Sequence, residues 1–154
     1  MHSRIFQIEK EPIKKEDYID SFSIPEWFTE SVADYASDDS NREEDIEWLM
    51  SAALGSIASV EGNKIIFSSD INEYFKEKYK EFANAAKELY TATLTEFISG
   101  DSIDMALFRL KSAYDDRYSF YIYSDYDLCT LDDFMRHVKA GETYFIGGTV
   151  DYHF

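Results

Sequence analysis

The residue types best suited to catalysis gather near the C-terminal end of the sequence. Asp133 and His137 stand four residues apart in a predicted helix, so both side chains project from one face. Carboxylate and imidazole groups of this kind bind divalent metal ions. The side chains that favour a metal-dependent enzyme as an alternative function are Asp125, Asp127, Asp133, His137, Asp151 and His153.

The case for such an enzyme is limited by the abundance of acid in this chain. With 31 acidic residues among 154, an aspartate close to a histidine is expected by chance. Neither His-x-x-x-His nor His-Glu-x-x-His occurs, and Asp132 and Asp133 also suit a helix N-terminus, where the helix dipole favours anions. We therefore assign no catalytic residue, no metal and no cofactor, and we favour a protein that is not an enzyme.

Nucleophilic and nucleotide chemistry find little support. The only cysteine, Cys129, has Asp125, Asp127, Asp132 and Asp133 as neighbours, and anionic surroundings oppose formation of a thiolate. There is no Gly-x-Ser-x-Gly elbow and no phosphate-binding glycine loop. The Gly147-Gly148 pair instead predicts the turn of a β-hairpin.

Two rows of carboxylates are the most distinctive spacing in the chain. Glutamates and aspartates recur every fourth residue from Glu26 to Asp38, and again from Asp39 to Glu47. Like charges at this spacing repel on a helix, at a cost of about 0.2–0.5 kcal/mol per pair. We expect the rows to form one exposed patch that binds a partner, through Glu26, Glu30, Asp34, Asp39, Glu43, Glu44 and Glu47.

The net charge supports the same interpretation. The formal charge is −16, and residues 16–61 hold thirteen acidic residues against Arg42 alone. Solubility asks only for a magnitude of about 2–8 in a small domain. Direct binding to nucleic acid is disfavoured because little here would neutralise phosphates. In composition the chain resembles the small acidic nucleic-acid mimics that phages and mobile elements direct against host defence proteins, which implies a basic protein surface as the partner.

Three functions remain open from the sequence. The first is a non-enzymatic acidic protein that binds a basic partner through residues 16–61, as a nucleic-acid mimic or inhibitor. The second is the metal-dependent enzyme, and the third is a plain protein-interaction domain. No signal peptide and no membrane span are evident, so a cytoplasmic protein without membrane partners is expected.

Composition and periodicity predict one globular α+β domain over residues 1–154. Hydrophobic residues make up 45% and aromatic residues 17%, which is enough for a core. We expect an antiparallel sheet packed against about five helices, one of them a long central helix at about 70–98. Its apolar residues follow a helical period and should share a buried face: Ile71, Phe75, Phe82, Ala86 and Leu89. The other helices are expected at 25–36, 41–54, 101–114 and 130–140, and the strands at 4–8, 57–60, 64–67, 117–123, 143–146 and 149–153.

Overall fold

The computed structural model describes residues 1–154. The chain divides into two compact units, of which the first joins Met1–Ile71 to Arg117–Phe154 and the second is Asn72–Asp116. The α+β class expected from the sequence is confirmed. None of the helices is both long enough and apolar enough to cross a membrane.

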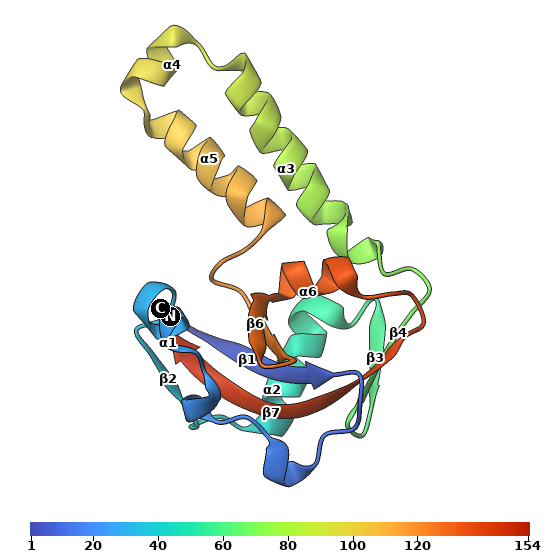
Figure 1. The fold of residues 1–154 in the computed structure, drawn as a ribbon. Helices are drawn as coiled ribbons and strands as arrows, with labels where there is room; N and C mark the ends of the chain where they lie inside the picture. The colour runs from blue at the N-terminus through green and yellow to red at the C-terminus, as the bar shows by residue number, and fades with distance from the viewer. The chain divides into compact units, whose positions relative to one another are not determined.

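A seven-stranded sheet forms the first unit (Figure 1). Its order is β3-β4-β7-β1-β5-β6, and β2 pairs with the far end of β7. The sheet is mixed because β1 and β5 run parallel while the other pairs are antiparallel. The strands are β1 (His2–Glu9), β2 (Tyr35–Ser37), β3 (Ala58–Glu61), β4 (Lys64–Phe67), β5 (Tyr121–Ser124), β6 (Asp127–Thr130) and β7 (Thr143–His153).

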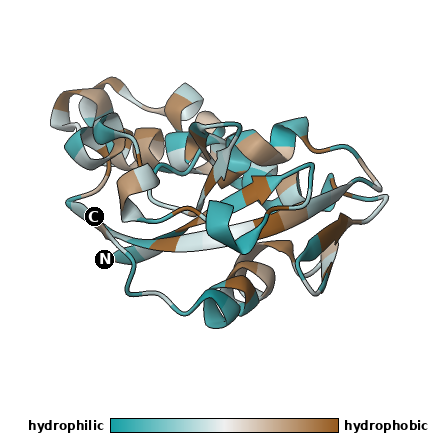
Figure 2. Ribbon diagram, turned by 60° about the horizontal axis from the view of Figure 1, so that its bottom comes forward, coloured by the Kyte–Doolittle hydropathy of each residue, from teal (hydrophilic) through white to brown (hydrophobic).

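Two helices cover opposite faces of this sheet. Helix α1 (Glu26–Ser31) inserts Phe28 against Tyr121 and Tyr152, with ring centroids 4.7 and 5.0 Å away. Helix α2 (Arg42–Leu49) places Trp48 against Phe120, with centroids 4.9 Å apart. Because neighbouring residues of a strand point to opposite faces, Arg4 of β1, which bonds Asp45 of α2, and Ile5, which belongs to the same cluster as Phe28, assign the two helices to different sides. Apolar residues, brown in Figure 2, recur along the strands between them.

The remaining helix of the first unit is α6 (Leu131–His137). The hydroxyl of Thr130 accepts a hydrogen bond from the Asp133 N–H at 3.1 Å and caps its start. Phe134 packs edge-on against Tyr144 of β7, with ring centroids 5.4 Å apart. The helix expected at 130–140 begins where the sequence indicated, directly after β6, and ends earlier, at His137.

The second unit is a helical hairpin with a short helix at its turn. Helices α3 (Glu73–Thr91) and α5 (Asp101–Tyr114) run side by side, and α4 (Leu94–Ser99) lies between them in sequence (Figure 1). The fully buried residues of this unit are all alanines, namely Ala85, Ala106 and Ala113. The large apolar residues predicted on the buried face of α3 are only half-buried.

The long helix expected at 70–98 is two helices, because a capping box interrupts it. Ala92 is extended, with ψ 136°, and Thr93 begins α4. The Thr93 hydroxyl accepts a hydrogen bond from the Glu96 N–H at 3.2 Å, and the Glu96 carboxylate accepts one from the Thr93 N–H at 2.8 Å. The bonds that this carboxylate accepts from the Thr93 N–H and from the Thr93 hydroxyl, both 2.8 Å long, lower the pKa of Glu96.

The helix expected at 25–36 ends early because its last residues join the sheet. After Ser31 the chain turns, and the N–H of Asp34 donates to the His153 carbonyl at 2.7 Å. Residues 35–37 then form β2 against β7. The helix expected at 41–54 is α2 followed by a π-helical turn over Met50–Leu54.

The hairpin turn predicted at Gly147-Gly148 is wrong, since both glycines lie inside the continuous strand β7. They are small because another segment crosses the strand there. A Cβ atom on Gly148 would stand 2.6 Å from the Ile19 carbonyl oxygen, and one on Gly147 would collide with the Gln7 side-chain amide. Gln7 itself bonds both sides of this crossing, accepting from the N–H groups of Ile19 and Gly148 at 3.1 and 3.0 Å.

We predict that Gly148→Ala lowers the free energy of unfolding by about 1–3 kcal/mol, as overpacking does in well-packed interiors. Urea titration followed by circular dichroism measures the change. Thr143→Ala, at an exposed position of the same strand, is the control and should stay within about 0.5 kcal/mol of the wild type. Equal stabilities of the two variants would show that the crossing segment yields easily.

Candidate functional sites

The outward face of α2 is acidic. Glu43, Glu44 and Glu47 are exposed, and their positions fall within one 100° arc of the helix. The opposite side buries Asp45, Ile46 and Leu49. The helix begins at Asn41, whose side-chain oxygen accepts hydrogen bonds from the Glu43 and Glu44 N–H groups at 3.1 and 3.4 Å. Acidic residues in this first turn also interact favourably with the helix dipole.

The other acidic residues of the predicted partner-binding set do not join this face. Glu26 and Glu30 are exposed on α1, which covers the opposite side of the sheet. Asp34 lies beyond α1 and contacts the His153 ring nitrogen at 3.0 Å, and Asp39 is exposed in the loop before α2. The single patch expected from the two rows is therefore two acidic surfaces, because the helices that carry them, α1 and α2, cover opposite faces of the sheet.

Few basic side chains neutralise these acids. No Lys or Arg forms an ion pair with Glu26, Glu30, Glu43, Glu44 or Glu47. The one base within residues 16–61, Arg42, points to the sheet instead. Its guanidinium donates to the carbonyls of Gly147 and Ile146 at 2.6 and 2.9 Å.

A buried ionic cluster joins α2 to the sheet. Arg4 of β1 donates to Asp45 of α2 at 2.6 Å and also to Asp151 of β7. The two carboxylates are 4% and 8% exposed. Thr149 adds a hydrogen bond to Asp45 at 2.8 Å, and His2 contacts Asp151 at 2.9 Å. Sequence reasoning missed this cluster because its members are distant in the chain.

The structure does not bring the six metal-ligand candidates together. Asp151 belongs to the Arg4 cluster, and His153 contacts Asp34. Asp125 and His137 line a common cleft, whereas Asp127 bonds the adjacent Leu128 N–H at 2.8 Å. No group of three or more His, Cys, Asp or Glu side chains is placed to hold a metal ion.

The cleft of the first unit lies where the parallel strands β1 and β5 end. It has a volume of about 830 Å³, and its lining includes Glu9, Tyr123, Asp125, His137 and Tyr144. Clefts at the carboxyl ends of parallel strands often bind ligands in α/β sheets. Sequence reasoning placed two of these five side chains among its candidates, and the other three have no local motif.

Burial shifts the acidity of several groups at this cleft. It raises the pKa of the Glu9 carboxyl, partly offset by hydrogen bonds from the Asp125 N–H at 3.0 Å and the Ser124 hydroxyl at 3.2 Å. Burial, together with a hydrogen bond donated to Glu142 at 2.8 Å, raises the pKa of Tyr144 to about 12. The same bond lowers the pKa of Glu142.

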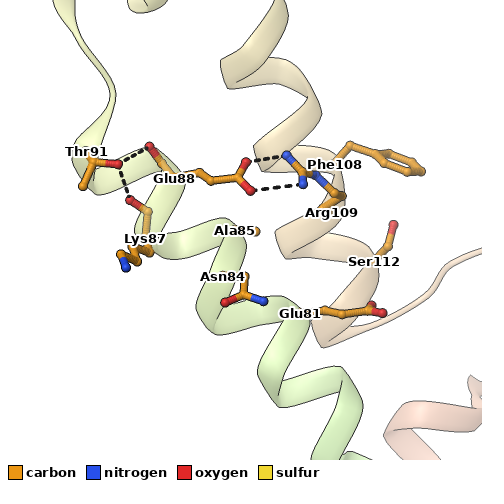
Figure 3. Close-up of a pocket in the computed structure, with 9 residues that line it drawn as sticks. All are labelled: Glu81, Asn84, Ala85, Lys87, Glu88, Thr91, Phe108, Arg109 and Ser112. Carbon is orange, nitrogen blue, oxygen red and sulfur yellow. Dashed lines mark hydrogen bonds and ion pairs between the residues drawn. The ribbon is translucent and has the colours of Figure 1, made fainter.

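A second cleft, of about 660 Å³, lies between α3 and α5 in the helical hairpin (Figure 3). The Glu88 carboxylate crosses it and accepts two hydrogen bonds from the Arg109 guanidinium, one of them 3.1 Å long. Asn84, Lys87 and Ser112 complete a polar lining. An ion pair already spans the cleft, and both its side chains are about half exposed.

Comparisons with known proteins give no match for this chain. No protein-family model, no curated protein and no solved structure matches it.

We predict that Arg4→Met lowers the free energy of unfolding by about 3–5 kcal/mol, because it leaves two buried carboxylates without their cation. The control is Arg109→Met, which removes a half-exposed ion pair in the hairpin and should cost at most about 1 kcal/mol. Thermal and urea unfolding measure both. A loss below about 1 kcal/mol for Arg4→Met would show that the buried cluster contributes little.

We predict that Tyr144 makes the protein less stable as the pH rises from about 10 to about 12. The unfolded chain loses the tyrosine proton near its ordinary pKa of 10.0, while the folded chain retains it to about 12. The free energy of unfolding therefore falls through this window. Tyr144→Phe should show a flatter decline in urea titrations at pH 9, 10, 11 and 12. Parallel declines for the two proteins would contradict the assigned cause.

Proposed function

We propose that this chain is a non-enzymatic protein that binds a basic partner protein through the acidic face of α2, formed by Glu43, Glu44 and Glu47. The observation that carries the proposal is the lack of any Lys or Arg paired with these exposed carboxylates. The partner is a basic surface of the kind that binds nucleic acid. The carboxylates then occupy positions that phosphates would otherwise take.

Electrostatics gives this surface a role in partner selection. On α3, in contrast, acids are paired with lysines of the same helix, as Glu77 is with Lys80 at 3.4 Å. The α2 face keeps its repulsion, which a cationic partner relieves. Such a partner is steered to the face at low salt, and the steering weakens as the Debye length falls from about 10 Å at 0.1 M to about 3 Å at 1 M.

Glu26 and Glu30 on α1 form a second acidic surface on the other side of the sheet. A single basic groove of a partner can contact only one side of the sheet at a time. We therefore assign the main contact to α2, which carries three carboxylates, and use α1 as the comparison surface in the experiment.

The test is a capture experiment with the full chain. Partners captured from cells of the source at 0.1 M salt are identified, purified and measured for binding to the wild type. We expect Glu43→Gln/Glu44→Gln/Glu47→Gln to weaken binding at least about 100-fold, since three charge-assisted contacts are lost at about 1 kcal/mol or more each. Glutamine keeps helix propensity and the oxygen that Asn41 contacts.

The matched control is Glu26→Gln/Glu30→Gln, which removes charge from α1 and should leave binding within about threefold. The partner should also release a bound DNA duplex when the wild-type chain is added. If the triple variant binds the purified partner as tightly as the wild type, or if the duplex and the chain bind together, the proposed function is wrong.

A further inference from the structure

The helical hairpin of residues 72–116 lacks a core of its own. Its only fully buried side chains are Ala85, Ala106 and Ala113. Two helices in contact through alanines bury little apolar surface, and isolated helices of this length are marginal in water. Large apolar side chains nevertheless remain at the surface, among them Tyr79 at 72%, Leu107 at 49% and Tyr114 at 59% exposed.

Both long helices carry the heptad spacing of a helical bundle. On α3 the apolar residues run 75, 79, 82, 86 and 89, at intervals of four, three, four and three. On α5 they run 103, 107, 110 and 114, at intervals of four, three and four. A repeat of this kind places one apolar seam along each helix, which packs against facing helices. Each buried alanine immediately precedes a seam residue, so the alanine contact leaves both seams beside it.

The two seams lie on the same side of the hairpin. Phe82 of α3 and Tyr114 of α5 approach with ring centroids 6.3 Å apart. The polar cleft with the Glu88–Arg109 pair uses other faces of the same helices (Figure 3). The hairpin therefore presents both seams on one side, here called the apolar side, and the Glu88–Arg109 pair on the other, while Met105 and Phe108 of α5 are exposed outside the seam.

The size and charge of the apolar side fit a second copy of this chain. Tyr79, Leu107 and Tyr114 together expose roughly 350 Å², if a large side chain has an area of about 150–250 Å². A standard interface buries ~800 Å² per partner, and the half-buried seam residues and their flanks add to the exposed area. The hairpin holds six basic and nine acidic residues, a net of −3, against −13 for the first unit. Two copies meet with least repulsion through their hairpins.

We infer that this chain forms a homodimer in which the apolar sides of two hairpins pack into a four-helix bundle. The seam positions of α3 and α5 form its core. The Glu88–Arg109 pairs stay outside it, and the acidic face of α2 belongs to the other unit and is not used. The inference is independent of the proposed function.

Sedimentation velocity on the full chain, from 1 to 100 μM, tests the dimer. We expect a species of about 36 kDa, twice the chain mass of 18.0 kDa. Leu107→Glu should raise the dimer dissociation constant by at least about 100-fold, because it buries a charge in an apolar interface. Tyr79→Glu, on the other helix, should do the same.

The matched control is Phe108→Glu, one residue further along α5. Phe108 is 60% exposed and lines the polar cleft, so this variant should dimerise within about threefold of the wild type. Far-ultraviolet circular dichroism checks that each variant keeps its helices. A wild type that is monomeric at 100 μM overturns the inference. So does a Leu107→Glu variant that dimerises normally, or a Phe108→Glu variant that dissociates equally.

Discussion

The Arg4 guanidinium is the contact on which the first unit depends. It lies between carboxylates of α2 and β7 and is contributed by β1 itself, so one side chain ties a helix to two neighbouring strands. Removing a cation from between two buried carboxylates is costly, while the intact cluster adds directional bonds that an apolar contact would lack. Its geometry fixes which side of α2 faces the sheet. The acidic residues of α2 face outward as a consequence.

The anchoring of α2 to the sheet also explains why no basic side chain of residues 16–61 pairs with the exposed acids of this helix. Arg42, its only base, is held by carbonyls of β7, and Arg4 is held by Asp45. Neither Arg4 nor Arg42 is therefore paired with the exposed carboxylates of α2. The exposed side keeps a charge that only a second molecule or salt can balance. The acidic surface of α2 thus follows from how the helix is anchored to the sheet.

Local signals predicted local structure, and the errors come from contacts distant in sequence. The helices expected at 101–114 and from residue 130, and the strands expected at 57–60 and 64–67, follow from short patterns that the structure bears out. The Thr93–Glu96 capping box is also a local signal, but the apolar period continues across it and predicted one unbroken helix. The Gly147-Gly148 pair looked like a turn because no local pattern reveals that residues 17–19 cross the strand. The Arg4 cluster and the cleft at Glu9 were unpredictable for the same reason, since their members meet only after β1, α2 and β7 are assembled.

The apolar period of α3 predicted a buried face, but its residues are only half-buried, and the neighbour of that face cannot be inferred from the period. A 4-3-4-3 spacing indicates that a helix packs against other helices. It does not indicate whether those helices belong to the same chain. Within the hairpin only alanines are fully buried, so the seam has more apolar surface than α5 covers. All strand pairs of the sheet lie within the first unit, so the sheet needs no second molecule. The hairpin differs from the sheet. In a pair of helices each apolar seam has one neighbouring helix, whereas in a four-helix bundle it has two.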